Sequence, residues 1–156
     1  MELTADELAG VVDVVGPLTR AELRRACSEL AFKRGADADP NHFGDAVEAA
    51  LAGYHLVAVA DHDAAAPLVV VGPAAFPELP EGATDLPHIL DVPARNVSRE
   101  RSARAAEQRF REDAAAAVGD GDTDRIEALL DVSYDLEAWG PVDLATARAR
   151  LDDATH

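Results

Sequence analysis

Two acidic clusters contain the residue types that bind divalent metal ions. His62 lies between two aspartates, and imidazole and carboxylate groups are both metal ligands. No second cluster supports a site there, so we interpret it as a polar hairpin tip. The segment Asp120–Asp124 alternates Asp with Gly and Thr, as at the start of a calcium loop, but an EF-hand needs Gly at its sixth position and Glu at its twelfth. Arg125 and Asp131 occupy those positions, which favours helix capping over metal binding.

The sequence offers little for nucleophilic or phosphate chemistry. Its single cysteine, Cys27, falls on the apolar face of a predicted helix, where a free thiol usually acts as a small hydrophobic group. The segment Gly119-Asp120-Gly121 lacks both the preceding strand and the following Lys of a phosphate loop. We therefore predict that the chain is not an enzyme and has no catalytic residue, cofactor-binding residue or metal site.

One segment, residues 95–111, runs against the overall charge, with only two acids, Glu100 and Glu107. Its arginines are Arg95, Arg99, Arg101, Arg104, Arg109 and Arg111. These arginines are our candidate interaction surface, for nucleic acid or for an acidic protein. The alternative is intramolecular pairing, since Glu100–Arg104 and Glu107–Arg111 are favourable i, i+4 pairs on a helix. We favour this alternative because exposed charge runs are usually solvated faces.

The N-terminal elements are predicted to be three helices and a β-hairpin. Two capping boxes, Thr4 with Glu7 and Thr19 with Glu22, begin the first two helices. The third helix begins near residues 41–42 and ends at residue 53. Residues at helical spacing that should be buried are Leu8, Val11, Val12 and Val15, then Leu23, Ala26, Cys27, Leu30 and Ala31, then Phe43, Val47, Ala50 and Leu51. The apolar runs 54–60 and 67–71 form the hairpin, and residues 36–40 a polar loop between the second and third helices.

This order of elements within residues 1–72 resembles the winged helix-turn-helix fold. The resemblance implies that the third helix enters the DNA major groove with Arg, Lys, Asn or Gln. That helix offers Asn41 and His42 but no Arg or Lys, whereas the second helix and its start carry Arg20, Arg24 and Arg25. These five residues are the candidate nucleic-acid contacts. The acidic third helix disfavours ordinary groove reading.

Residues 76–97 are predicted to be an ordered, proline-rich connector. Its prolines exclude a regular helix, apart from one turn near residues 87–90. Its apolar residues are too many to leave in solvent at no cost, so we expect them to pack onto the preceding core. Those residues are Phe76, Leu79, Leu86, Ile89, Leu90 and Val92.

The C-terminal unit, residues 98–156, is predicted to be a helical hairpin followed by one more helix. Its first helix buries Ala103, Ala106, Phe110, Ala114 and Ala117, its second Ile126, Leu129, Leu130 and Tyr134, and its third Leu144, Ala147 and Leu151. With a winged-helix-like unit at 1–75, the fold class is α+β: mainly α with a small β-hairpin.

The net charge of −16 comes from 30 acids against 14 basic residues, of which only Lys33 is a lysine. Such a charge destabilises a compact chain in dilute salt but is screened in molar salt. Together with abundant Ala and Arg in place of Lys, it is typical of a salt-loving archaeon. No apolar run is long enough to cross a membrane and no signal peptide is present, so we predict a cytoplasmic location.

Three segments carry a likeness to a family of small haloarchaeal proteins of unknown function: Gly72–Pro77 (GPAAFP), Asp85–Asp91 (DLPHILD) and Tyr134–Trp139 (YDLEAW). The resemblance implies a lineage and a shared fold, and it implies no catalytic residue. We expect a non-catalytic interaction or regulatory protein whose partner is a protein. The alternative is a DNA-binding transcriptional regulator of the winged helix-turn-helix type. The oligomeric state stays open.

Overall fold

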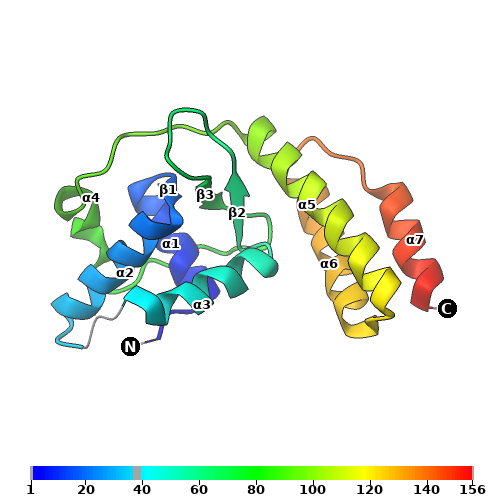
Figure 1. Cartoon of the computed structure of the whole chain (residues 1–156), viewed down its shortest axis with the longest axis horizontal. Coiled ribbons are helices and arrows are strands. Elements are labelled where there is room, and N and C mark those ends of the chain that lie inside the picture. Colours follow the sequence, from blue (N-terminus) through cyan, green and yellow to red (C-terminus); the bar gives the residue numbers. More distant parts are fainter. Residues whose placement is uncertain (1, 37–39, 156) are drawn as a thin grey trace. The chain divides into compact units, whose positions relative to one another are not determined.

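The computed structural model describes residues 2–36 and 40–155, which divide into two compact units, Met1–Val97 and Ser98–His156. Most of the described chain is helical, with one small antiparallel sheet in the first unit (Figure 1). The predicted class, mainly α with a small β part, is therefore confirmed. The connector is part of the first unit, since the boundary between the units follows Val97.

The first unit begins with three helices: α1 (Ala5–Val15), α2 (Arg20–Lys33) and α3 (Pro40–Ala52). Both capping boxes are present, because the Thr4 and Thr19 hydroxyls accept the N–H of Glu7 and Glu22 and each glutamate accepts the threonine N–H in return. The third helix begins slightly earlier than the sequence indicates. Most of the predicted loop between α2 and α3, residues 37–39, lies outside the described residues.

The sheet contains β1 (Leu18–Thr19), β2 (Leu56–Val59) and β3 (Leu68–Val71) in the order β1-β3-β2, with both pairs antiparallel. The predicted hairpin corresponds to β2 and β3, in which Leu56 lies opposite Val71 and Val59 opposite Leu68. The sequence analysis missed β1. Its two residues are too few to show an alternating pattern, and they are followed directly by the α2 capping box.

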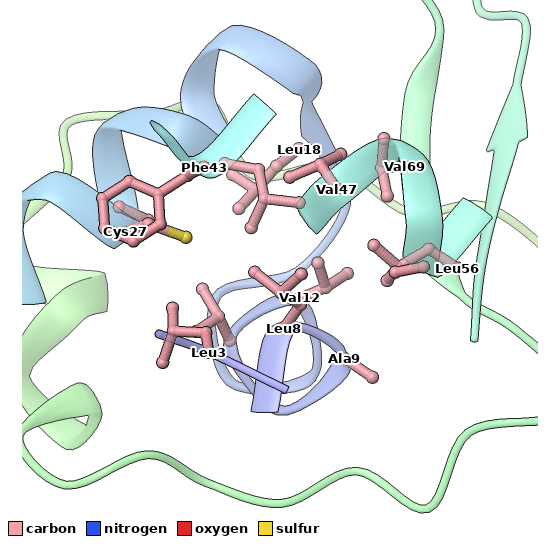
Figure 2. Close-up of a cluster of buried hydrophobic side chains, with 14 of the residues drawn as sticks. Leu3, Leu8, Ala9, Val12, Leu18, Cys27, Phe43, Val47, Leu56 and Val69 are labelled. Carbon is pink, nitrogen blue, oxygen red and sulfur yellow. The ribbon is translucent and has the colours of Figure 1, made fainter. Parts of the chain in front are cut away.

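Side chains from all these elements converge on one core. Figure 2 shows Leu8 and Val12 of α1 among residues of α2, α3 and the strands, including Phe43 and Leu56. The predicted helical stripes account for most of this core, although Val15 is only half-buried. Cys27 is completely buried here, as its place on the apolar face of α2 predicts.

The connector packs on the core of the first unit but does not bury all its apolar residues. It contains a 3-10 turn (Ala83–Asp85) and the short helix α4 (Leu86–Ile89), close to the predicted turn. Leu86 and Leu90 are buried in the core, and Val92 packs against it. The expectation for the other three was wrong, because Phe76, Leu79 and Ile89 are 82%, 50% and 38% exposed.

The second unit consists of α5 (Arg99–Asp120), α6 (Thr123–Trp139) and α7 (Ala145–Thr155). Ser98 and Asp122 cap α5 and α6 by accepting backbone N–H groups, so the Asp120–Asp124 segment caps a helix. The α5 stripe is buried as predicted, and so are the α7 residues. Tyr134 was placed wrongly in the core: it is 61% exposed, and Val132, Ser133 and Leu136 are buried on α6 instead.

Across residues 2–36 and 40–155, each helix is too short or too polar to traverse a lipid bilayer.

Candidate functional site

The candidate nucleic-acid contacts lie on the α2–α3 surface. Three of the five, Arg20, Arg24 and Asn41, line a shallow cavity of about 290 Å³ together with Asp45 and Glu48. The other two do not line it. Arg25 is exposed on α2, and the His42 ring packs edge-on against Phe43 with centroids 5.3 Å apart.

The charges around this cavity balance. The Arg20 Nε donates to both carboxylate oxygens of Glu48, at 3.1 and 3.2 Å, so this cation is neutralised by α3 itself. Arg24 lies over the α3 backbone at Gly44, where an added Cβ would be 3.8 Å from the Arg24 Cδ and Nη1 atoms. Asp45 supplies the second lining carboxylate. Two arginines and two carboxylates line this cavity, so the surface is electrically neutral.

The arginines of residues 95–111 do not form one surface. Arg95 belongs to the first unit, where its Nη1 and Nη2 atoms donate to the Glu22 carboxylate at 2.5 and 3.2 Å. Partial burial opposes ionisation of Glu22, but the hydrogen bonds from Arg95 and from the Thr19 N–H outweigh it and lower the pKa of Glu22. This ion pair joins the end of the connector to the first turn of α2.

The other arginines of this segment lie on α5, and most have partners within the second unit. Arg99 stacks on the Trp139 ring, 4.5 Å from its centroid, and donates to the Trp139 carbonyl at 2.8 Å. The expected pairs Glu100–Arg104 and Glu107–Arg111 are both formed, and Arg109 pairs with Asp113. Arg101 is exposed on the first turn of the helix. Most arginines of residues 95–111 are thus paired within the chain.

The sequence analysis missed a network of polar contacts between α6 and α7. Arg148 lies over the Tyr134 ring, 4.3 Å from its centroid, and donates to Glu137 at 2.9 Å and to the Ser133 hydroxyl at 3.1 Å. Glu137 also accepts the N–H of Leu144, and these two hydrogen bonds lower its pKa. The residues are 11 and 15 positions apart, so no local spacing reveals the network.

Groups that could perform chemistry are sparse in the described part of the chain. No group of three or more His, Cys, Asp and Glu side chains there could hold a metal ion. The only cysteine is buried, and desolvation raises the pKa of the Cys27 thiol to about 12. The thiol therefore stays protonated at neutral pH and is a poor nucleophile.

Comparison with known proteins gives a family but no assigned activity. No curated protein and no solved structure matches the chain with significance. The model of one protein family matches residues 6–156. The chain therefore belongs to this family of unknown function, DUF7109.

Proposed function

We propose that this chain is a non-catalytic interaction or regulatory protein whose first unit is winged-helix-like and binds another protein. The order α1-β1-α2-α3-β2-β3, with the sheet order β1-β3-β2, supports the winged-helix-like description. In DNA-binding proteins of that fold the third helix makes the contact with DNA, and we propose that α3 is the contact helix here.

The observation that carries the proposal is the charge of α3. Its exposed side presents Asp45 and Glu48, and the helix contains no Lys or Arg. Arg20, from the start of α2, is paired with Glu48. Asp45 makes no ion pair with any residue that the structure describes, so a phosphate backbone would meet one uncompensated carboxylate and no free cation of α3, whereas a basic side chain of a protein partner would meet complementary charge.

We further propose that the protein functions in the cytoplasm of a halophilic archaeon. The net charge of −16 and the single lysine support this setting. Molar salt also weakens binding that depends on phosphate contacts, since affinity falls steeply with salt as counterions are released. A partner recognised by apolar contacts with a few charges is better suited to that solvent.

The test is quantitative capture of partners from a native high-salt lysate by the full chain and by the double variant Asp45→Asn/Glu48→Gln. The proposal expects a protein that is captured by the wild-type chain and lost with the variant. Glu112→Gln/Glu127→Gln, which neutralises two exposed acids of the second unit, is the matched control and should retain the partner.

DNA binding is the competing outcome, and one observation favours it: Arg20, Arg24 and Asn41 line the same cavity. Duplex binding that survives molar KCl and disappears with Arg20→Gln/Arg24→Gln would place the DNA-binding role first. Loss of a captured protein with the acidic variant, together with no duplex binding, would support the protein-binding role.

A further inference from the structure

Residues 76–79, the Phe76–Leu79 segment, form an apolar projection with a fixed backbone. The N–H of Phe76 donates to the Asp6 carboxylate at 3.0 Å, and the N–H of Glu78 donates to the Asp6 carbonyl at 2.9 Å. Gly10 allows this close approach, because a Cβ at that position would collide with the Glu78 carbonyl. Phe76 and Leu79 are nevertheless 82% and 50% exposed. Large apolar side chains presented from an ordered backbone are typical of interface anchors.

The second unit contains an apolar groove between α5 and α7. Its volume is about 730 Å³, and small or aliphatic residues line it, including Ala114, Ala115 and Val118 from α5 and Ala147 and Leu151 from α7. Val118 is 41% exposed. Small side chains let a bound segment approach the helices closely, and the volume lies in the range of pockets that enclose large apolar groups.

The charges at the groove suit an acidic segment. Arg111 and Arg150 both line it, against one carboxylate, Asp153. Arg111 is paired with Glu107 at 3.5 Å, whereas Arg150 makes no ion pair with any residue that the structure describes. Because Glu107 offsets Arg111, Arg150 is the cation that the groove offers to an acidic segment.

The chain itself carries the complement of this groove. The Phe76–Leu79 segment combines two exposed apolar side chains with the exposed carboxylate of Glu78. We propose that the protein self-associates head to tail, with the Phe76–Leu79 segment of one copy seated in the α5–α7 groove of a second copy. Phe76 and Leu79 enter the apolar groove, and Glu78 faces Arg150.

This contact is small, and that sets its expected strength. Stable interfaces bury about 800 Å² on each partner, which is more than one short segment supplies. The association is therefore weak and concentration-dependent. Because each copy carries both halves, a head-to-tail contact can be repeated and join a row of copies. The contact does not involve α3, so it is independent of the function proposed above.

Sedimentation velocity of the full chain in molar KCl, at concentrations up to about 1 mM, tests the proposal. The wild-type chain should show reversible self-association. Phe76→Ser removes the segment's anchor and Ala115→Arg fills the groove, so each variant alone should associate at least about tenfold more weakly. An equimolar mixture of the two should form a 1:1 heterodimer, because one variant keeps an intact groove and the other an intact segment.

Matched controls come from the same chain. Phe32→Ser changes another exposed phenylalanine, 76% exposed on α2, and Ala116→Arg changes an exposed α5 residue outside the groove; both should associate like the wild type. Leu79→Ser replaces Phe76→Ser if circular dichroism shows that the latter is unfolded. A wild-type chain that is monomeric throughout, a mixture that gives no heterodimer, or equal losses in the controls would overturn the proposal.

Sedimentation velocity of the Asp45→Asn/Glu48→Gln variant distinguishes self-association through the groove from the partner binding proposed for α3. Self-association that is unchanged by this variant supports a contact separate from α3. Self-association lost with this variant would overturn the groove contact, whatever is found for partner capture.

Discussion

Arg95 and Glu22, which are 73 positions apart in the sequence, form a bidentate ion pair with nitrogen–oxygen distances of 2.5 and 3.2 Å. Their side chains are only 15% and 21% exposed. Arg95 also lies 3.4 Å from the Pro17 carbonyl, which places it over the start of α2. The pair fixes the last part of the connector to the helix start that carries the second capping box.

The first prediction is that breaking this pair destabilises the first unit. Arg95→Ala or Glu22→Gln should lower the free energy of unfolding by about 1–3 kcal/mol at neutral pH, because a partly buried charged hydrogen-bonded pair is lost. The exposed pair Arg20–Glu48 is the control, and Glu48→Gln should lower it by less than about 1 kcal/mol. Urea denaturation of each variant measures the difference, and equal losses for the two pairs would contradict it.

The same pair predicts a pH dependence. The pKa of Glu22 is lowered below its usual value of 4.5 in the folded chain, so its contribution is complete at neutral pH and is lost as the pH falls through 4.5 and then through the folded pKa. The difference in unfolding free energy between the wild type and Glu22→Gln should therefore shrink on acidification. A difference that stays constant between pH 7 and pH 3 would show that Glu22 is not responsible.

The second prediction concerns the packing of the connector on α1. Gly10→Ala should destabilise the chain by about 1–3 kcal/mol, because the added Cβ would collide with the Glu78 carbonyl and displace the connector. Gly119→Ala is the matched control: that helical position has nothing within 4 Å, so alanine should stabilise by up to about 1 kcal/mol. Thermal unfolding of both variants shows whether each substitution lowers or raises the stability. Stabilisation by Gly10→Ala would show that the connector does not lie against α1.

Patterns that are local in sequence predicted the local structure well. Thr4 with Glu7 and Thr19 with Glu22 are complete capping boxes because the motif contains both partners of each hydrogen bond. The stripes on the first three helices were largely buried because a helix repeats every 3.6 residues whatever it packs against.

The burial predictions that were wrong concern apolar side chains that face solvent instead of the core. Phe76 and Tyr134 carry large aromatic rings, as the buried Phe43 and Tyr54 do, but the connector's hydrogen bonds to Asp6 and the stacking of Arg148 on Tyr134 hold them at the surface. The distant pair Arg95–Glu22 had no local signal either. Only the three-dimensional arrangement brings such residues together, and this is also why the groove between α5 and α7 was not foreseen.

The third prediction separates the two kinds of apolar residue in the connector. Leu86→Ala and Leu90→Ala should each lower the unfolding free energy by about 2–5 kcal/mol, because these side chains are 0% and 3% exposed in the core. Ile89→Ala, at an exposed position on the same short helix, should lower it by less than about 1 kcal/mol. Denaturant unfolding measures all three, and a large effect of Ile89→Ala would place that side chain in the core.

The fourth prediction concerns salt. With a net charge of −16, the chain should fold cooperatively in about 2 M KCl and lose its near-UV circular dichroism in dilute buffer, where charge repulsion is unscreened. Trp139, which is stacked by Arg99, provides a fluorescence signal for the second unit. Equal stability in both buffers would contradict the halophilic origin proposed for the charge.

The fifth prediction decides whether the arginines of α5 bind nucleic acid. Arg104 and Arg111 are each paired with a glutamate one turn earlier, and Arg101 lies on the same helix. If these pairs are their role, Arg101→Gln/Arg104→Gln/Arg111→Gln should lower stability modestly, by about 0.2–0.5 kcal/mol per lost pair, and leave partner binding unchanged. If instead they contact phosphates, the variant should weaken duplex binding equally for all sequences and reduce the salt slope by up to about 3.

We expect stability to fall modestly and binding to stay unchanged, because the chain carries 30 acids for 14 basic residues and most arginines of this segment already have acidic or aromatic neighbours. Titration of fluorescent duplex and single-stranded DNA and RNA, in moderate and in molar KCl, makes the measurement. Micromolar binding in molar KCl that vanishes in the triple variant would put nucleic acid ahead of protein as the partner.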